Sequence, residues 1–145
     1  MKVNHIALAV PSIDEFLTSN QLLYADFSRG PLIVNETQDV REMFISDGAT
    51  VLELLEPMSD KSPVLGFLKR NRSGGLIHVA FDVEDLAAAI GDVERAGGRV
   101  IVEPVPDIAF NYRRIAFVIL NGQLAELIEM PAGAAHDLGN ATPAD

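Results

Sequence analysis

The feature that most constrains the fold of this 145-residue chain is an internal repeat with one fixed offset. The stretch HIALAV at residues 5–10 resembles HVAFDV at 78–83, and VLELLEP at 51–57 resembles LAELIEM at 124–130. A single offset of 73 residues, without a gap, aligns His5 with His78, Arg41 with Arg114, Phe44 with Phe117, Glu53 with Glu126 and Glu56 with Glu129. Chance could produce either match alone, but both at one offset indicate a duplicated module.

Each module shows the same order of secondary-structure signals. Ser12, with Glu15 three residues later, has the capping pattern that starts a helix, and Asp85 is the corresponding cap in the second module. Gly97 and Gly98 mark the end of the second helix. The sequence therefore predicts β-α-β-β-β twice: a strand at about 2–10, a helix to about 23 and extended stretches at about 30–35, 40–46 and 50–56, then a strand at about 76–83, a helix over 86–96 and strands at about 99–103, 112–119 and 123–130.

The length suits one domain with a substantial core. Ser62 and Pro63 are predicted to begin a short connecting helix, and NRSGG at 71–75 to form a flexible joint. After Pro131 the chain has no apolar periodicity, so we expect disorder there. The predicted organisation is a single domain at 1–131, made of module 1 at about 1–57, a linker with a helix at about 58–75 and module 2 at about 76–131, followed by a disordered tail at 132–145.

Composition excludes several classes of function. Hydrophobic residues make up 48% of the chain, which excludes disorder of the whole, and the lack of cysteine excludes disulfides, thiolate metal sites and thiol nucleophiles. The formal charge of −10, from 21 acidic and 11 basic residues, argues against binding to nucleic acid and favours cationic ligands. The N-terminal MKVNHIALAV does not resemble a signal peptide, and no stretch approaches the roughly 20 apolar residues of a membrane span. We therefore expect a cytoplasmic protein with no membrane partner.

Two histidines and two glutamates occupy unusual places within predicted strands. Alternate residues of a strand share a face, so Glu53 and Glu126 each lie between apolar neighbours on one face. A carboxylate on a buried apolar face is costly unless an arginine, a proton, ordered water or a metal ion compensates it. His5 and His78 share their faces with alanines, which leave room for a ligand.

These four residues would converge if the two modules face one another around a pseudo-twofold axis. Two carboxylates that meet without a cation would repel each other, and one would take up a proton. A divalent metal ion removes this conflict, and two histidines with two carboxylates form a mixed nitrogen and oxygen set suited to Zn, Ni, Co, Mn or Fe. A core histidine or a solvent-facing glutamate is the simpler alternative for each residue taken singly.

Four segments resemble a known family. HIALAVPSID, LELLEP followed by SPVLGFLKRN, GGLIHVAFDVEDL and the late ELIE are similar to segments of the vicinal oxygen chelate superfamily, and within it to methylmalonyl-CoA epimerases. The resemblance implies an α+β fold in which two tandem βαβββ modules form a curved mixed sheet around a metal site. It also implies one divalent metal ion (Zn, Ni, Co or Mn) held by His5, Glu53, His78 and Glu126, although epimerases often have glutamine where Glu53 stands.

A further glutamate is a candidate catalytic base. The stretch TQDVREMFI resembles an epimerase segment whose glutamate, at the position of Glu42, removes a proton. Alternation places Glu42 on an otherwise apolar face, and burial there would raise its pKa toward a value useful for a base. The alternative is a surface glutamate paired with Arg41 or Arg114. Glu126 is the second candidate base, if it detaches from the metal.

One segment departs from the epimerase pattern. Many epimerases carry a Gly-His-Gly-like loop where this chain has PDIAFNYRRIAFVI. Arg113 and Arg114 in this segment are candidates for binding a substrate carboxylate or phosphate, and Lys69, Arg70 and Arg72 are candidates for binding the phosphates of a CoA tail. A solvated basic pair on an edge strand and a solvated helix end are the corresponding alternatives.

The predicted function is that of a metal-dependent epimerase or isomerase that abstracts a proton α to a carbonyl group. The substrate would be a small molecule, either an acyl-CoA thioester such as methylmalonyl-CoA or a related carbonyl compound. The alternatives are a glyoxalase I-like lactoylglutathione lyase and a non-catalytic binding protein of the bleomycin-resistance kind. Because homodimers are common in the superfamily, the resemblance also implies a homodimer, with the site within one chain or across two.

Overall fold

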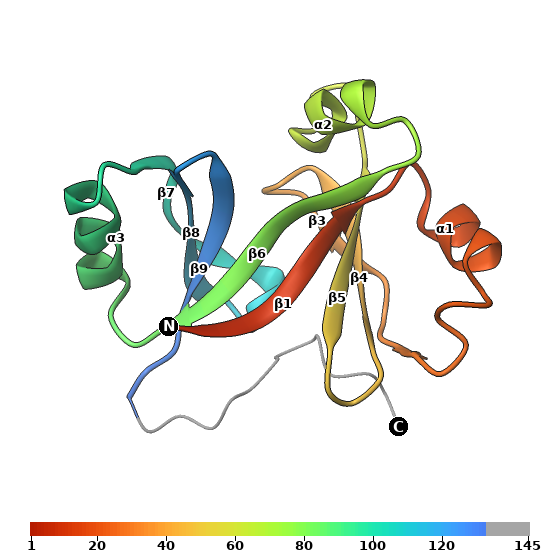
Figure 1. The fold of residues 1–145 in the computed structure, drawn as a ribbon, viewed down its shortest axis with the longest axis horizontal. Helices are drawn as coiled ribbons and strands as arrows, with labels where there is room; N and C mark the ends of the chain where they lie inside the picture. Colours follow the sequence, from red (N-terminus) through yellow and green to blue (C-terminus); the bar gives the residue numbers. More distant parts are fainter. Residues whose placement is uncertain (133–145) are drawn as a thin grey trace.

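The computed structural model describes residues 1–132, which form one mixed sheet with helices packed against it (Figure 1). The tail was predicted to be disordered from residue 132, and its residues 133–145 lie outside the described residues. In chain order the elements are β1 (Lys2–Ala9), α1 (Ile13–Ser19), β2 (Ser28–Arg29), β3 (Ile33–Asn35), β4 (Val40–Ser46), β5 (Val51–Pro57), α2 (Val64–Arg70), β6 (Gly75–Val83), α3 (Leu86–Arg95), β7 (Arg99–Asp107), the 3-10 helix η1 (Ile108–Phe110), β8 (Arg113–Leu120) and β9 (Gln123–Glu129). Among these elements, no helix combines the length and the apolar character that a membrane crossing requires.

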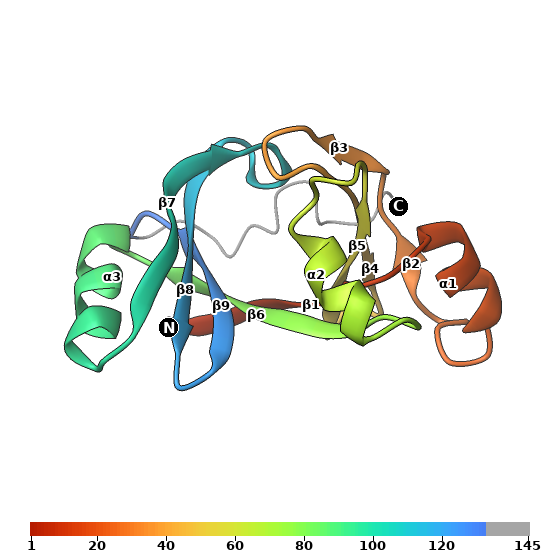
Figure 2. The ribbon, with the colours of Figure 1, turned by 90° about the horizontal axis from the view of Figure 1, so that it is seen from above.

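The strands form a single sheet in the order β2-β4-β5-β1-β6-β9-β8-β7, and β3 pairs separately with β4. β1 pairs parallel with β5, β6 pairs parallel with β9, and β1 and β6 pair antiparallel with each other. The sheet is bent into a U, with β1 and β6 as its base and the other strands of each module as one arm (Figure 2). α1 and α3 lie outside the two arms (Figure 2). The predicted α+β fold with a curved mixed sheet is therefore confirmed.

The two modules repeat their strand register as well as their order of elements. Under the 73-residue offset, the pairs Ala7–Glu53 and Phe44–Glu53 of module 1 become Ala80–Glu126 and Phe117–Glu126 of module 2, and all four are observed. The ion pair between Arg41 and Glu56, 2.7 Å long, recurs at the same length between Arg114 and Glu129. One offset therefore relates the two modules in space as it does in sequence.

Helices α1 and α3 begin where their capping residues predict. The Ser12 hydroxyl accepts a hydrogen bond from the Glu15 amide at 3.2 Å, and the Asp85 carboxylate accepts one from the Ala88 amide at 2.9 Å. Each contact satisfies an N–H of the first helical turn that has no partner within the helix. Gly97, with a φ of 89°, follows the second of these helices as the sequence predicts.

Two helix boundaries differ from the prediction. α1 ends at Ser19 rather than near residue 23, and Asn20 caps this end: its backbone N–H and its side chain both donate to the carbonyl oxygen of Phe16, at 3.0 Å and 2.9 Å. α2 begins after Pro63, and the Ser62 hydroxyl has no hydrogen-bond partner among the described residues. Ser62 therefore does not cap α2, and that prediction is wrong.

The joint between the modules packs closely on β1. Gly74 has a φ of 85°, and a Cβ atom there would lie 2.3 Å from the carbonyl oxygen of Ala9. Glycine is therefore required at this point by both the backbone angle and the close approach of the Gly74 and Ala9 backbones. This contact begins the antiparallel pairing of β6 with β1.

Apolar side chains fill both sides of the curved sheet. Outside the arms, α1 buries Leu17 against module 1 and α3 buries Leu86 against module 2. Inside the U, a separate cluster surrounds the base of the sheet and consists of Ile33, Phe44, Ala80, Ala109, Phe110, Ile115 and Ile128. The His5 ring packs edge-on against Phe44, with centroids 5.4 Å apart, and stacks on Phe110 at 5.7 Å. Any polar group inside the U therefore lies in an apolar surrounding.

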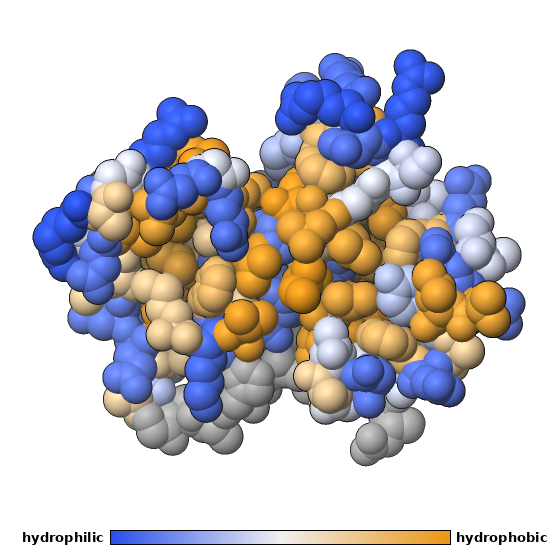
Figure 3. Space-filling view, viewed as in Figure 1, coloured by the Kyte–Doolittle hydropathy of each residue, from blue (hydrophilic) through white to orange (hydrophobic). Residues whose placement is uncertain are grey.

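The outer face of the base of the U is also apolar in part. Figure 3 shows apolar side chains gathered across the middle of this face and near the end of α1. Val3 of β1 and Leu76 of β6 are more than half exposed, and Leu22, just after α1, is 92% exposed. Large apolar side chains exposed together often mark a contact surface.

Candidate metal centre and active site

Each strand at the base of the U carries one extra residue directly before its histidine. In the pairing of β1 with β6 the register shifts between Val3 and His5, which makes Asn4 the extra residue on β1, and a second shift makes Ile77 the extra residue on β6. Asn4 and Ile77 are again 73 residues apart. Such bulges bend a strand and re-aim a side chain, and they are frequent beside functional sites. The repeat therefore includes the local distortion that accompanies His5 and His78.

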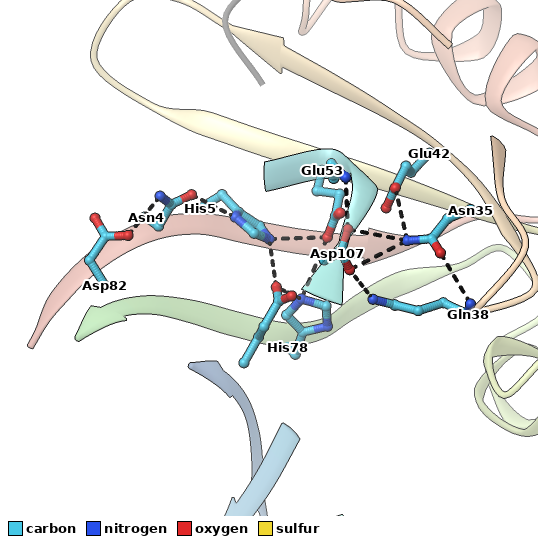
Figure 4. A network of polar contacts seen from close by, with 11 residues as sticks. Asn4, His5, Asn35, Gln38, Glu42, Glu53, His78, Asp82 and Asp107 are labelled. Atoms are coloured by element: carbon cyan, nitrogen blue, oxygen red, sulfur yellow. Dashed lines mark hydrogen bonds and ion pairs between the residues drawn. The ribbon is translucent and has the colours of Figure 1, made fainter. Parts of the chain in front are cut away.

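The four residues of the repeated motif meet inside the U. We refer to His5, Glu53, His78 and Glu126 as the His/Glu cluster. Each offers one nitrogen or oxygen atom, and these atoms all lie within 4.8 Å of one another. His5 Nε2 lies 3.0 Å from Glu53 Oε2, and His78 Nε2 lies 3.5 Å from the same oxygen (Figure 4). Glu126 Oε2 lies 3.4 Å from His5 Nε2 and 3.3 Å from His78 Nε2. No residue of the cluster is more than 3% exposed.

The donor set of this cluster fits a metal ion. His78 Nε2 and Glu126 Oε2 are buried and make no hydrogen bond with the described residues. Buried polar atoms without a partner are uncommon and costly, and they need an explanation. Two imidazole nitrogens and two carboxylate oxygens form a set that divalent ions such as zinc bind. The structure thus brings together all four residues that were predicted to hold a metal.

The charges of the cluster also balance. Burial alone would lower the pKa of His5, but the carboxylates of Glu53 and Glu126 outweigh it and raise this pKa to about 10. Burial would raise the pKa of Glu53, but His5 and then His78 hold it below its ordinary value. The pKa of His78 is raised and that of Glu126 is lowered, because each offsets its own burial by contact with the oppositely charged residues. The rings and the carboxylates of the cluster therefore stabilise charges of opposite sign on one another, and two neutral rings with two carboxylates would balance the charge of one divalent cation.

Glu42 lies beside the cluster as a further buried carboxylate. It is 1% exposed, and its Oε1 accepts a hydrogen bond from Asn35 Nδ2 at 3.2 Å. Burial, and then the charge of Glu53, raise the pKa of Glu42 to about 11. Arg41 pairs with Glu56 instead. The alternative of a surface glutamate paired with a neighbouring arginine is therefore wrong.

Asp107, at the end of β7, joins Glu42 through Asn35. β7 extends beyond its predicted end near residue 103, and the Asp107 carboxylate starts η1 by accepting a hydrogen bond from the Ala109 amide at 2.8 Å. Asn35 Nδ2 donates to Asp107 Oδ1 at 3.3 Å, and Gln38 Nε2 also donates to Asp107 (Figure 4). Burial is the main cause that raises the pKa of Asp107 to about 6. We refer to Asn35, Gln38, Glu42 and Asp107 as the carboxylate network.

The sequence analysis did not identify Asn35, Gln38 or Asp107 as site residues. Asp107 precedes IAF as Asp85 precedes the helix of module 2, so its capping position was readable from the sequence. Its approach to Asn35, 72 residues earlier in the chain, has no signal in local periodicity. The repeat offers no signal either, because Ile108 stands 73 residues after Asn35.

The basic residues that were predicted to bind substrate are not brought to the His/Glu cluster. Arg114 binds Glu129 through two nitrogens, at 2.9 Å and 2.7 Å. Arg113 donates to Met130 Sδ at 2.8 Å. Lys69 and Arg70 are exposed in the last turn of α2, and Arg72 is exposed just beyond it.

A cavity of about 610 Å³ lies next to the cluster. His78 and Gln38 are part of its wall, so the cavity touches both the His/Glu cluster and the carboxylate network. Most other lining side chains are apolar and come from both modules, among them Leu55, Val105, Ile115, Phe117 and Leu124. A largely apolar wall with a few polar groups is typical of small-molecule sites.

Comparison with known proteins places this geometry in a family. Residues 4–117 match the Glyoxalase/Bleomycin resistance protein/Dioxygenase superfamily. The chain belongs to this superfamily. It is 35% identical over 133 residues to the mitochondrial methylmalonyl-CoA epimerase of Dictyostelium discoideum, which covers 88% of this chain and 78% of the relative. It is 33% identical over 135 residues to the ethylmalonyl-CoA/methylmalonyl-CoA epimerase of Cereibacter sphaeroides, which covers 87% of this chain and 96% of the relative.

A solved structure of a superfamily member supports the same assignment. A variant of Streptomyces coelicolor methylmalonyl-CoA epimerase, in complex with 2-nitronate-propionyl-CoA, is 32% identical and matches with a TM-score of 0.74 over 92% of this chain and 96% of the other. The predicted resemblance to the vicinal oxygen chelate superfamily, and to its epimerases in particular, is therefore confirmed. These relatives support an enzyme of the epimerase or isomerase class over the lyase and the non-catalytic binding protein.

Proposed function

We propose that the protein is a metal-dependent epimerase that removes and returns the proton on the carbon next to the carbonyl group of an acyl-CoA thioester. The observation that carries this proposal is the buried Glu42 carboxylate beside the buried His/Glu cluster. Relatives named for methylmalonyl-CoA and ethylmalonyl-CoA are 35% and 33% identical to this chain. Methylmalonyl-CoA and ethylmalonyl-CoA are therefore the substrates to test first.

The His/Glu cluster would hold one divalent metal ion, with Zn, Ni, Co and Mn as the candidates. A bound divalent cation would supply positive charge that stabilises negative charge on the substrate carbonyl oxygen and offsets the charge of Glu53 near Glu42. The two buried atoms without hydrogen bonds, on His78 and Glu126, support this assignment.

Glu42 is the group to which we assign removal of the α-proton. A carboxylate in an apolar surrounding is a stronger base than one in water, because burial disfavours its charged form. The neutral Asn35 amide holds the Glu42 carboxylate in place without adding a charge that would weaken it as a base. Glu126 remains the second candidate for this step.

The acyl group would bind in the cavity next to His78. The apolar wall suits an alkyl substituent, and Lys61, which also lines the cavity, offers a positive charge for a substrate carboxylate or phosphate. The substrate-binding role predicted for Arg113 and Arg114 stays a prediction. It would require the pair between Arg114 and Glu129 to open.

The test of this function is exchange of the substrate α-proton in deuterated water, followed by NMR. Wild-type protein with methylmalonyl-CoA should incorporate deuterium, and Glu42→Gln should lower the rate by about 10²- to 10⁴-fold, the usual contribution of a general base. Glu103→Gln makes the same chemical change at an exposed residue of β7 and should exchange at the wild-type rate. A Glu42→Gln protein with the wild-type rate would remove Glu42 from this role. Turnover of a hemithioacetal, with none of any acyl-CoA, would contradict the epimerase function.

We also propose that the protein is a homodimer. The exposed apolar residues on the outer face of the base and after α1, including Val3, Leu22 and Leu76, support this assembly. Light scattering after size-exclusion chromatography should give twice the chain mass, and a monomer at all concentrations would contradict the proposal.

The cytoplasmic location stays a prediction, which fractionation of the native cells would test.

A further inference from the structure

Asn4 connects a histidine of the His/Glu cluster to a carboxylate of the other module. Asn4 Oδ1 lies 2.8 Å from His5 Nδ1, and Asn4 Nδ2 donates to Asp82 Oδ1 at 3.0 Å (Figure 4). Asn4 is 5% exposed and His5 1%, so water competes little for these contacts. Asp82 lies on β6, so the contacts run from one base strand to the other and then into the cluster.

The orientation of the Asn4 amide decides which nitrogen of His5 carries a proton. An ionised carboxylate only accepts hydrogen bonds, so the amide nitrogen of Asn4 faces Asp82 and the amide oxygen faces His5. An amide oxygen also only accepts, so His5 Nδ1 is the donor in this contact. In a neutral ring the lone pair is then on Nε2. This is the atom that faces Glu53 at 3.0 Å and Glu126 at 3.4 Å.

The second module does not repeat this arrangement. Ile77 occupies the bulge position equivalent to Asn4, and Ala9 stands at the position equivalent to Asp82. Ile77 packs against the apolar cluster beneath α2 and offers no polar atom to His78. The four ligand positions are therefore symmetric, whereas the hydrogen-bonded support behind them lies on the His5 side.

We propose that Asn4 and Asp82 are positioning residues that hold His5 with its proton on Nδ1, and that they strengthen metal binding by the His/Glu cluster. This inference rests on the metal binding proposed above. Partners of this kind fix the tautomer and the orientation of a metal-bound histidine, and their loss typically costs roughly 10- to 100-fold in metal affinity. The bulge at Asn4 makes the contact possible, because it brings the Asn4 side chain to the edge of the His5 ring.

The test is the affinity of the metal-stripped full chain for Zn²⁺, measured in competition with a chromophoric chelator. Asn4→Leu removes both hydrogen bonds at similar volume, Asp82→Ala removes only the outer one, and Ile77→Leu alters the equivalent bulge, which has no such hydrogen bond to lose. The Kd for Zn²⁺ should rise by roughly 10- to 100-fold in Asn4→Leu and by less in Asp82→Ala. It should stay close to the wild-type value in Ile77→Leu, because this exchange is apolar and conserves volume.

A second measurement reads the tautomer directly. Nitrogen-15 NMR of the histidine side chains in the Zn²⁺-loaded protein should show His5 protonated at Nδ1 in wild type, and this signature should be lost in Asn4→Leu. Asp82 is partly exposed, so Asp82→Ala tests the proposal even if Asn4→Leu fails to fold.

Wild-type Zn²⁺ affinity in both Asn4→Leu and Asp82→Ala, or a wild-type His5 with its proton on Nε2, would overturn the proposal. If the wild-type protein does not bind Zn²⁺, both the proposed metal centre and the proposed role of Asn4 and Asp82 are overturned. Weakened Zn²⁺ binding in the two variants would support the proposal even if the wild-type protein has no activity on acyl-CoA, and only the proposed reaction would then fail.

Discussion

The His/Glu cluster and the carboxylate network lie side by side, but they relate differently to the repeat. Each module gives the cluster one histidine and one glutamate from equivalent positions. The network has no such symmetry, because Glu42 of module 1 corresponds to Ile115 of module 2. Both residues occupy the same register, opposite Leu55 and Ile128 respectively.

This difference distinguishes the proposed metal-binding residues, which repeat between the modules, from the proposed base, which does not. A duplicated module naturally produces a symmetric set of ligands around one point, and such a set suits an ion. The proposed proton removal needs a base on one side of the substrate, and the change of a single position between the modules places the Glu42 carboxylate on one side only. Ile115, packed with Phe110 and Ile128, keeps the other side apolar.

The largest expected effect is the loss of metal from the His/Glu cluster. Wild-type protein purified without chelators should contain near-stoichiometric divalent metal by elemental analysis. His78→Ala should lose it, because only three of the four ligands remain. Glu42→Gln should keep its metal while it loses proton exchange. If Glu42→Gln also loses the metal, the cluster and the network are not separate functional units.

Ile115, the residue of module 2 equivalent to Glu42, should contribute to the free energy of unfolding. Ile115 is fully buried, and Ile115→Ala leaves a cavity in the cluster inside the U, so the free energy of unfolding should fall by about 2–5 kcal/mol. Urea denaturation followed by circular dichroism measures this change. Ile101→Ala, at an exposed position of β7, is the control and should change stability by less than about 0.5 kcal/mol. Equal effects of the two variants would contradict a packing role for Ile115.

Within the carboxylate network, Asp107→Asn should impair catalysis without removing the metal. The amide would disturb the contacts of Asn35 and Gln38 with Asp107 and thereby loosen the orientation of Glu42. A lost buried hydrogen bond of this kind costs about 1–3 kcal/mol, which corresponds to roughly 5- to 150-fold in kcat. Asp26→Asn, at an exposed residue, should retain the wild-type rate. Unchanged exchange kinetics in Asp107→Asn would place Asp107 outside the catalytic machinery.

The smallest effects should come from the two ion pairs that the modules share. Arg41 and Arg114 are 41% and 55% exposed in their side chains, and exposed ion pairs contribute about 0.2–1 kcal/mol each. Arg41→Ala and Arg114→Ala should lower the free energy of unfolding by similar small amounts. A clear rise in KM in Arg114→Ala alone would instead support the predicted role of Arg114 in substrate binding.

What the sequence could predict follows from local patterns and from the repeat. Alternation places Glu53 and Glu126 on one face of their strands, and the common offset pairs them with His5 and His78, so the cluster was readable before the fold was known. Ser12 and Asp85 mark the helix starts because a cap acts on its own next few residues. The order of helices and strands along each module follows from the same two kinds of information.

The remaining contacts depend on long-range register and on bulges. The approach of Asn4 to Asp82 requires an extra residue in β1, and that of Asn35 to Asp107 requires β7 to continue toward β3. Neither contact is signalled by a local sequence period or by an equivalent pair of residues 73 positions away. The end of α1 was misjudged for a related reason, because the Asn20 side chain can bind the carbonyl oxygen of Phe16 only once the preceding turn has formed.

The presence of Glu42 on one side only has a stereochemical consequence. An enolate is planar at the carbon that has lost its proton, so each of its faces leads to one configuration. A proton that Glu42 returns to its own face regenerates the starting isomer. Inversion needs either a donor at the opposite face or a turn of the enolate within the cavity. The distribution of deuterium between the two stereoisomers would therefore tell whether one group or two groups exchange protons with the enolate.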